Sequence, residues 1–145
     1  MATRKGLVRR MSAVAFGLTL GAVGVLMATG PAEAQSTVVL GTGSNIIGVA
    51  YEDGNFGGNG IFVTSVNPGC TATLSDMDFT IAVMPAGWND EISSAKGSVG
   101  SGGFSACWWK FWADGLNRGD SIGYSFQFPY VGDGFNDRAS AGALS

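Results

Sequence analysis

The sequence predicts an all-β domain. The 145-residue chain contains 24 glycines, of which only five fall in the first 34 residues. The remaining part is therefore far richer in glycine than the usual share of about 7%. Glycine at this frequency is typical of tight turns between short strands. Uninterrupted stretches of good helix formers are almost absent, and the length suits one compact domain over residues 35–145.

The first 34 residues are predicted to be a secretory leader. Four basic residues precede an uncharged stretch over residues 11–31: Arg4, Lys5, Arg9 and Arg10. The stretch ends near Ala32-Glu33-Ala34, which matches the small-residue pattern of a cleavage site. A retained anchor is the weaker alternative, because the stretch contains several glycines and is short for a membrane span. We expect a secreted, extracellular protein that begins at Gln35, and the paired arginines leave the export route open.

The charge balance excludes two classes of partner. The whole chain has eight basic and eleven acidic residues, and removal of the leader leaves four and ten, a net charge of about −6. Nucleic acids and anionic membranes are bound through clustered lysine and arginine. We therefore expect neither as a partner of the mature protein, which we expect to be a monomer. An acidic chain is compatible with cation binding.

Two apolar, β-branched segments open the domain, at residues 36–40 and 46–51. A glycine-rich turn over residues 41–44 separates them, so the pattern predicts two short strands and a turn. A nucleotide-binding loop is excluded, because Ile46 occupies the third glycine position and no helical pattern follows.

Residues 51–58 predict a folded hairpin. Gly54 and Gly58 can take positive φ where the chain reverses. The rings of Tyr51 and Phe56 can then cover the turn. Taken alone, this segment is equally well explained as an ordinary hairpin.

A counterpart of this hairpin occurs at residues 112–119. It keeps the first aromatic residue as Trp112 and both glycines as Gly115 and Gly119. Asn117 stands where the second aromatic residue would be. The second hairpin is therefore expected to pack less tightly than the first.

Cys70 and Cys107 are the only cysteines of the chain. In an exported protein an even pair is most simply a disulfide, which here would join the two halves of the domain. A redox-active or nucleophilic thiol is the alternative. It is disfavoured because there is no Cys-x-x-Cys spacing and no histidine to act as a base.

The chain also contains an internal repeat of oxygen-bearing residues. Residues 88–94 and 135–141 share an aromatic residue, Asn-Asp, two variable positions, a serine and a small residue. Carboxylate, carbonyl and hydroxyl oxygens are the ligands of hard cations such as calcium. The alternative is that both Asn-Asp pairs only cap turns. Two copies with serine at the same position favour the calcium interpretation.

These features resemble the βγ-crystallin superfamily, in which paired Greek-key motifs each contain a Tyr-x-x-x-x-Phe-x-Gly hairpin. Its microbial members bind calcium through an Asn/Asp-Asn/Asp-x-x-Ser/Thr-Ser signature. Residues 89–94 match that signature at every position, and residues 136–141 match it except at the last. The resemblance extends over most of residues 48–145. It implies a β-sandwich of two motifs, at about residues 46–97 and 104–145.

In this family each calcium ion is shared between the two motifs, which implies up to two ions here. One site would use the Asp90 carboxylate, the Glu91 main-chain carbonyl and the Ser140 hydroxyl. A main-chain carbonyl from a hairpin would join them. Water would complete the six to eight oxygens that calcium prefers.

The second site would use the Asp137 carboxylate, the Arg138 main-chain carbonyl and the Ser93 hydroxyl. The hairpin carbonyls are expected from Glu52 and Ala113, with both side chains left free. The resemblance also assigns supporting positions in the hairpins and signatures: Tyr51, Phe56, Gly58, Asn89, Ser94, Trp112, Gly119 and Asn136.

The chain departs from the family pattern in three places. Ala141 replaces a serine whose family role is to pin the folded hairpin, and Asn117 replaces an aromatic residue. The first half has 14 additional residues between hairpin and signature, which predicts a long loop or extra strand between about residue 66 and Met84. The charge of Arg138 further predicts unequal sites, the weaker one in the millimolar range of extracellular modules.

An aromatic cluster follows Cys107. Because alternate residues of a strand face opposite sides, Trp108 and Trp112 should share one face and Trp109 and Phe111 the other. One pair is expected in the core. Exposed tryptophan on the other face would form a carbohydrate or protein contact.

An enzyme is the least supported class, because the chain has no histidine, no Gly-x-Ser-x-Gly elbow and no zinc-type cluster. Small secreted domains of this architecture resemble inhibitors of extracellular metalloproteinases, and also killer toxins and stress-related calcium-binding modules. An inhibitor needs a rigid exposed loop, and residues 66–70 beside Cys70 fit that need. We therefore expect a calcium-binding inhibitor of an extracellular peptidase, with a toxin or a simple calcium module as the alternative.

Overall fold

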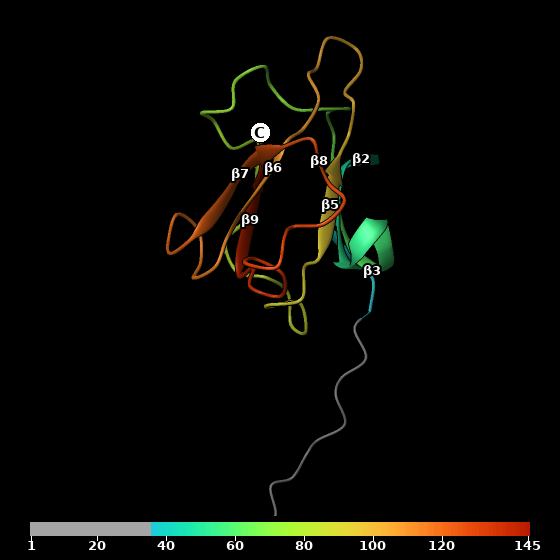
Figure 1. Cartoon of the computed structure of the whole chain (residues 1–145). Helices are drawn as coiled ribbons and strands as arrows, with labels where there is room; N and C mark the ends of the chain where they lie inside the picture. The colour runs from blue at the N-terminus through green and yellow to red at the C-terminus, as the bar shows by residue number, and fades with distance from the viewer. Residues whose placement is uncertain (1–35) are drawn as a thin grey trace, which may run out of the picture. The chain divides into compact units, whose positions relative to one another are not determined.

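Residues 36–145 form two β-sheets that face each other in the computed structural model, which describes this part of the chain (Figure 1). The predicted all-β sandwich is confirmed, since this part contains nine strands and a single turn of 3-10 helix. The predicted leader at residues 1–34, and Gln35, lie outside the described residues. Within residues 36–145 there is no helix with the length and apolar character of a membrane span.

The first sheet has the order β1-β3-β2-β5-β8 and the second has the order β4-β9-β6-β7. The strands of the first sheet are β1 (Val38–Gly41), β2 (Asn45–Asp53), β3 (Gly57–Ser65), β5 (Ser94–Gly97) and β8 (Gln127–Phe128). Those of the second are β4 (Phe79–Ile81), β6 (Trp109–Trp112), β7 (Ser121–Ser125) and β9 (Ala141–Leu144). The 3-10 turn η1 (Gly54–Phe56) joins β2 to β3.

Each sheet takes one strand from the opposite half of the chain. Strand β8 from the second half pairs with β5, where Phe128 lies opposite Ala95. Strand β4 from the first half pairs with β9, where Phe79 lies opposite Leu144. Neither half can therefore complete its own sheet, and the loops that follow β4 and β8 begin in the sheet of the other half.

The strands expected at residues 36–40 and 46–51 both form, but they do not pair with each other. Strand β1 instead pairs in parallel with β3, and Val38 lies opposite Ile61. A Cβ atom at Gly41 or Gly43 would overlap the backbone at the end of β3. The glycine-rich turn is thus required because the chain passes directly against a neighbouring strand.

The hydrophobic core lies between the two sheets. Its large buried side chains come from both of them and from the loops between: Ile47, Ile61, Val63, Trp88, Ile92, Trp109, Phe111 and Leu144. The rings of Trp109 and Phe111 stack with centroids 5.0 Å apart and an interplanar angle of 11°. The Trp109 indole nitrogen donates a hydrogen bond to the Lys96 carbonyl at 2.9 Å, so its polar atom is satisfied.

The predicted alternation of the aromatic cluster is confirmed for Trp109 and Phe111, which share the core. The expectation of an exposed second face is wrong for Trp112, which is only 4% exposed because it packs in a separate cluster with Ala141 and Ala143. The expectation of an exposed side chain is confirmed for Trp108, which precedes β6 and is 38% exposed.

The predicted disulfide between Cys70 and Cys107 is confirmed, and both residues are fully buried. It joins the loop after β3 to the loop before β6. A main-chain bridge between Cys70 and Ser105 reinforces this connection. The additional residues of the first half lie in the long loop of residues 66–78, which leads into β4.

Replacement of both cysteines by alanine, as Cys70→Ala with Cys107→Ala, should lower the free energy of unfolding. The disulfide closes a segment of 37 residues, for which the loop-closure estimate is about 3 to 4 kcal/mol. Urea unfolding monitored by tryptophan fluorescence measures this loss. An unchanged midpoint in the double variant would contradict the structural role given to the bond.

Candidate metal centre

The two repeated signatures lie at the same end of the sandwich, in the loops of residues 82–93 and 129–140 (Figure 1). The first loop follows β4 and leads into β5. The second follows β8 and leads into β9. Because β4 and β8 are the exchanged strands, each loop starts in one sheet and ends in the other, which brings the two signatures next to each other.

Main-chain hydrogen bonds hold the two loops together. The Asp90 N–H donates to the Ala139 carbonyl at 3.1 Å, and the Asp137 N–H donates to the Ile92 carbonyl at 3.4 Å. Asp90 and Asp137 both adopt left-handed backbone conformations, with φ of 61° and 54°. Asp and Asn tolerate this region better than most residues. The same local conformation therefore presents both carboxylates.

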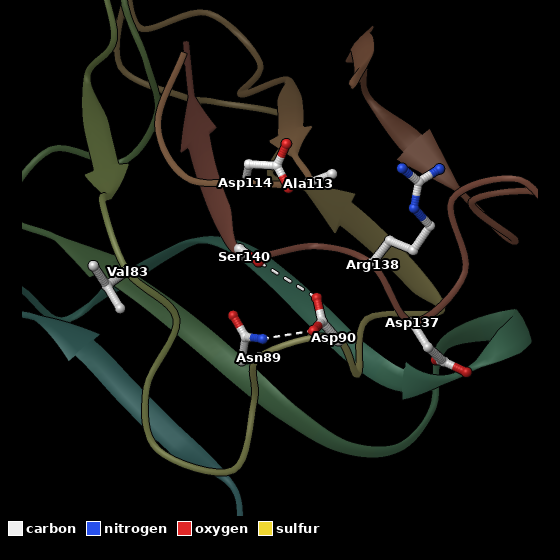
Figure 2. Close-up of a pocket in the computed structure, with 8 residues that line it drawn as sticks. All are labelled: Val83, Asn89, Asp90, Ala113, Asp114, Asp137, Arg138 and Ser140. Carbon is white, nitrogen blue, oxygen red and sulfur yellow. Dashed lines mark hydrogen bonds between the residues drawn. The ribbon is translucent and has the colours of Figure 1, made fainter. Parts of the chain in front are cut away.

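Each signature serine points to the aspartate of the opposite motif. The Ser140 hydroxyl lies 3.4 Å from Asp90 Oδ1, as Figure 2 shows. The Ser93 hydroxyl lies 3.4 Å from Asp137 Oδ1. Both distances are long for hydrogen bonds between oxygens, which favour about 2.7 Å. Two crossed pairs of oxygens with this spacing leave room for a cation to contact both members of each pair.

The signature asparagines orient the aspartates. Asn89 Nδ2 donates to Asp90 Oδ2 at 2.6 Å, and Asn136 Nδ2 donates to Asp137 Oδ2 at 2.7 Å. Each amide thus engages one carboxylate oxygen and leaves Oδ1 directed to the serine. Asn136 Oδ1 is buried and has no hydrogen-bond partner among the described residues. A buried acceptor of this kind usually has a water or ion as its partner.

The main-chain hydrogen bonds of Ser140 and Ser93 show which hairpin lies next to each Ser-Asp pair. Ser140 N–H donates to the Trp112 carbonyl at 2.9 Å, which places Ala113 beside the Asp90 pair. Ser93 N–H donates to the Tyr51 carbonyl at 2.9 Å. Glu52, the next residue after Tyr51, is therefore beside the Asp137 pair, as Ala113 is beside the Asp90 pair.

A pocket of about 570 Å³ opens at the Asp90 pair (Figure 2). It is lined by residues of both signature loops and of the second hairpin: Val83, Asn89, Asp90, Ala113, Asp114, Asp137, Arg138 and Ser140. The predicted residues Asp90, Ala113 and Ser140 therefore meet in one cavity. The Glu91 and Arg138 carbonyls directly follow the two aspartates in sequence, and their role as ligands stays a prediction.

Asp114 is a lining residue that the sequence interpretation missed. Its carboxylate lies directly against Gly119, where any side chain would collide with it. The signal was present in the sequence, because Asp114 follows Ala113 in the hairpin and Gly119 is the second glycine of the hairpin pattern. It supplies a further oxygen donor within reach of the cavity.

The expected effect of Arg138 on the second site needs correction. Its guanidinium forms an ion pair with Asp120 at 2.9 Å and donates to the Gly134 carbonyl at 2.6 Å. The charge is thus directed to Asp120, and the side chain lines the pocket of the Asp90 pair. Its charge is not a reason to rank the Asp137 pair as the weaker one.

The first hairpin is pinned by Ser94. Its hydroxyl donates to the Asp53 carbonyl at 2.6 Å and accepts from the Phe56 N–H at 2.9 Å. The rings of Tyr51 and Phe56, which were expected to cover the turn, make an edge contact with centroids 5.9 Å apart. Gly58 has the predicted positive φ of 72°. The serine thus fixes the turn that positions the Glu52 carbonyl.

Two details of this hairpin differ from expectation. Positive φ occurs at Asn55 and Phe56, with 56° and 64°, and not at Gly54, because η1 places the reversal one residue later. The Glu52 side chain is also not free, since its Oε1 accepts from the Asn59 main-chain and side-chain nitrogens at 2.8 and 3.0 Å. The carboxylate is used to close the hairpin.

The second hairpin lacks the equivalent pin. Ala141 occupies the place of Ser94 and is fully buried beside Trp112. Asn117 and Gly119 take positive φ of 59° and 67°. The turn is held by main-chain bonds, including Arg118 N–H to the Gly115 carbonyl at 2.9 Å.

The donor set suits a hard cation. Within residues 36–145 there is no group of three or more His, Cys, Asp and Glu side chains that could hold a metal ion by themselves. What the structure brings together at each pair is one signature carboxylate and one serine hydroxyl. Oxygens of these kinds are the ligands that hard cations prefer.

The fold and the paired loops define a β-sandwich of two reciprocally joined Greek-key motifs with an oxygen-rich centre at one end. No protein-family model and no curated protein sequence matches the chain. Among solved structures, a βγ-crystallin domain from Clostridium beijerinckii is similar at 20% identity and a TM-score of 0.47, with 68% of this chain and 95% of that chain covered. A clostrillin double mutant in complex with nickel is similar at 22% identity and a TM-score of 0.46, with 68% and 95% covered.

Substitution Ser94→Ala should destabilise the domain by about 1 to 3 kcal/mol, because it removes two hydrogen bonds of a fully buried hydroxyl, to the partly buried Phe56 N–H and to the Asp53 carbonyl. The free energy of unfolding in urea measures the effect. Ser101→Ala, at an exposed serine in a loop, is the matched control and should change it little. Equal effects of the two substitutions would show that Ser94 does not pin the hairpin.

Proposed function

We propose that the protein is a secreted βγ-crystallin-like domain that binds up to two calcium ions. The observation that supports this most directly is the pair of crossed contacts, Ser140 with Asp90 and Ser93 with Asp137. Each joins a carboxylate and a hydroxyl from different motifs. Together with one signature carbonyl and one hairpin carbonyl, each site would have four protein oxygens.

Water would supply the remaining oxygens, since calcium takes six to eight. Four protein ligands with a single signature carboxylate predict modest affinity, because affinity rises with ligand charge and rigidity. Asp114 adds negative charge beside the Asp90 site. We therefore propose that the Asp90 site is the tighter of the two.

Calcium would stabilise the domain by joining its two halves. Each signature loop would supply ligands to both ions, a carboxylate to one and a hydroxyl to the other. Binding at one site would order the loop that contributes to the other. The proposed role of the ions is therefore first structural, and the proposed protein is a non-catalytic monomer.

We further propose that the biological activity is inhibition of an extracellular metalloproteinase. The loops of residues 66–70 and 98–107 contain no charged residue and are joined by the buried disulfide at the end of the sandwich opposite to the calcium centre (Figure 1). Val66 and Val99 in these loops are 73% and 78% exposed. A preorganised, exposed loop loses little entropy when it enters a protease cleft.

Calorimetric titration of residues 35–145 with calcium should show saturable binding that decreases in Asp90→Ala and in Asp137→Ala. At a calcium concentration about 100 times the dissociation constant, one site would add about 2.7 kcal/mol of stability, so the melting temperature should rise with calcium. The double variant should lose both effects.

Asp78→Asn is the matched control for loss of a carboxylate, because Asp78 lies in the long loop of residues 66–78 and bonds Thr71. It should bind calcium as the unsubstituted protein does. Absence of binding heat and of a thermal shift in the unsubstituted protein would refute the calcium function.

The inhibitor proposal predicts that the purified domain slows peptide hydrolysis by a thermolysin-like metalloproteinase. Shortening the loop of residues 66–70 should remove this effect while calcium binding remains. Full protease activity at a large excess of the domain would contradict the proposal. Growth arrest of fungal or bacterial cells under the same conditions would instead support the toxin alternative.

A further inference from the structure

Val83 and Tyr130 occupy equivalent places in the two motifs, and both expose apolar surface. They are 47 residues apart, the offset that also separates Asn89 from Asn136. Each is the second residue after an exchanged strand, β4 for Val83 and β8 for Tyr130. Val83 is 79% exposed and Tyr130 is 48% exposed. Core packing does not explain an exposed apolar residue at the same position of both motifs.

Val83 lies at the margin of the Asp90 pocket, as Figure 2 shows. The next residue, Met84, is buried, and its N–H donates to the Ser140 carbonyl at 3.0 Å. The chain is therefore anchored directly behind Val83 by the serine that faces Asp90. Val83 is held in place at the rim of the centre.

Tyr130 has the same relation to the other centre. The N–H of the buried Val131 donates to the Ser93 carbonyl at 2.9 Å. The Tyr130 hydroxyl donates to Asp133 Oδ1 at 2.8 Å. That hydrogen bond, with a smaller contribution from the charge of Asp137, raises the pKa of Tyr130. Tyr130 thus directly precedes the residue that bonds the main chain of Ser93, the serine that faces Asp137.

The charge of this end depends on bound ions. Its loops and second hairpin contain more acidic than basic side chains: Asp90, Glu91, Asp114, Asp120, Asp133 and Asp137 against Arg118 and Arg138. Without ions this surface repels anions. Two calcium ions would add four positive charges, and each ion would retain coordination positions for oxygens from a partner.

We propose that the calcium-loaded end docks on an anionic phospholipid surface, with lipid phosphate oxygens on the ions and Val83 and Tyr130 in the interface. This inference rests on the proposed calcium function. It revises the expectation that the mature protein binds no membrane, because that expectation follows from the charge of the ion-free chain. The revision applies only when calcium is bound.

The arrangement favours a bilayer over a protein partner. Stable protein interfaces have an apolar centre and a polar rim. Here the centre is polar and the apolar side chains lie at its margins. In a membrane interface, apolar side chains can enter the acyl boundary while the ions stay at the level of the phosphates. Tyrosine is enriched at that depth.

The test is sedimentation of residues 35–145 with vesicles of phosphatidylcholine and phosphatidylserine, with calcium or with a chelator. This segment contains both sheets and the core that packs between them. Binding should require both calcium and phosphatidylserine. Val83→Ser and Tyr130→Ser should each weaken it by roughly three- to tenfold, as expected for removal of a partly inserted apolar side chain.

Val99→Ser is the matched control, because Val99 is 78% exposed but lies at the opposite end. It should leave vesicle binding unchanged. Calcium titration of every variant is run in parallel. Tyr130→Ser should bind calcium normally, and because Val83 lines the Asp90 pocket, vesicle binding of Val83→Ser is compared at calcium concentrations that saturate that variant. Soluble phosphoserine should compete only weakly, since it offers the phosphate without the interface.

Normal calcium binding without vesicle binding would overturn this inference and leave the proposed calcium function intact. Equal losses of vesicle binding in Val83→Ser and Val99→Ser would also overturn it. So would complete competition with the vesicles by soluble phosphoserine, if Val83→Ser has no effect on vesicle binding. Absence of calcium binding would overturn the proposed function and the docking surface together.

Discussion

The exchange of one strand between the two sheets is the constraint on which the rest of this structure depends. Because β4 completes the second sheet and β8 completes the first, the following loops must return across the end of the sandwich to reach β5 and β9. They pass each other there and bond through Asp90 and Asp137 main-chain groups. The crossed Ser-Asp contacts are a consequence of this path, since Ser93 directly precedes β5 of the first sheet and Ser140 directly precedes β9 of the second.

The two halves of the domain resemble each other closely in the signature loops but differ in the hairpins. The loops repeat every 47 residues from Val83 to the small residue at Ser94 or Ala141. The hairpins differ because Ser94 supplies two hydrogen bonds that Ala141 cannot make. Two centres with equivalent signatures thus rest on supports of unequal rigidity. For the proposed calcium sites these differences act in opposite directions, because the pinned hairpin would favour the Asp137 site and the charge of Asp114 would favour the Asp90 site.

The two ends of the sandwich differ in chemistry. One end has paired acidic loops whose charge would change on ion binding. At the other end the uncharged segments 66–70 and 98–107 are joined by the Cys70–Cys107 disulfide, and the long loop of residues 66–78 also contains Asp76 and Asp78. A covalent bond therefore stabilises the end opposite to the two signature loops. The disulfide holds one end and the bonds between the signature loops hold the other. Because the two ends are held independently, the two proposed functions can use different ends of one small domain.

The sequence by itself determined the all-β class, the Tyr51–Phe56 hairpin and the position of both signatures, because turns and glycine spacing are local properties. It also determined the disulfide, because two cysteines allow only one pairing. It also suggested which serine faces which aspartate, through a family resemblance. Only the tertiary structure decided that β1 pairs with β3, that Arg138 bonds Asp120 and that Asp114 and Val83 line the pocket. Those outcomes depend on where exchanged strands and distant loops meet, and contacts at long sequence separation are not specified by any local pattern.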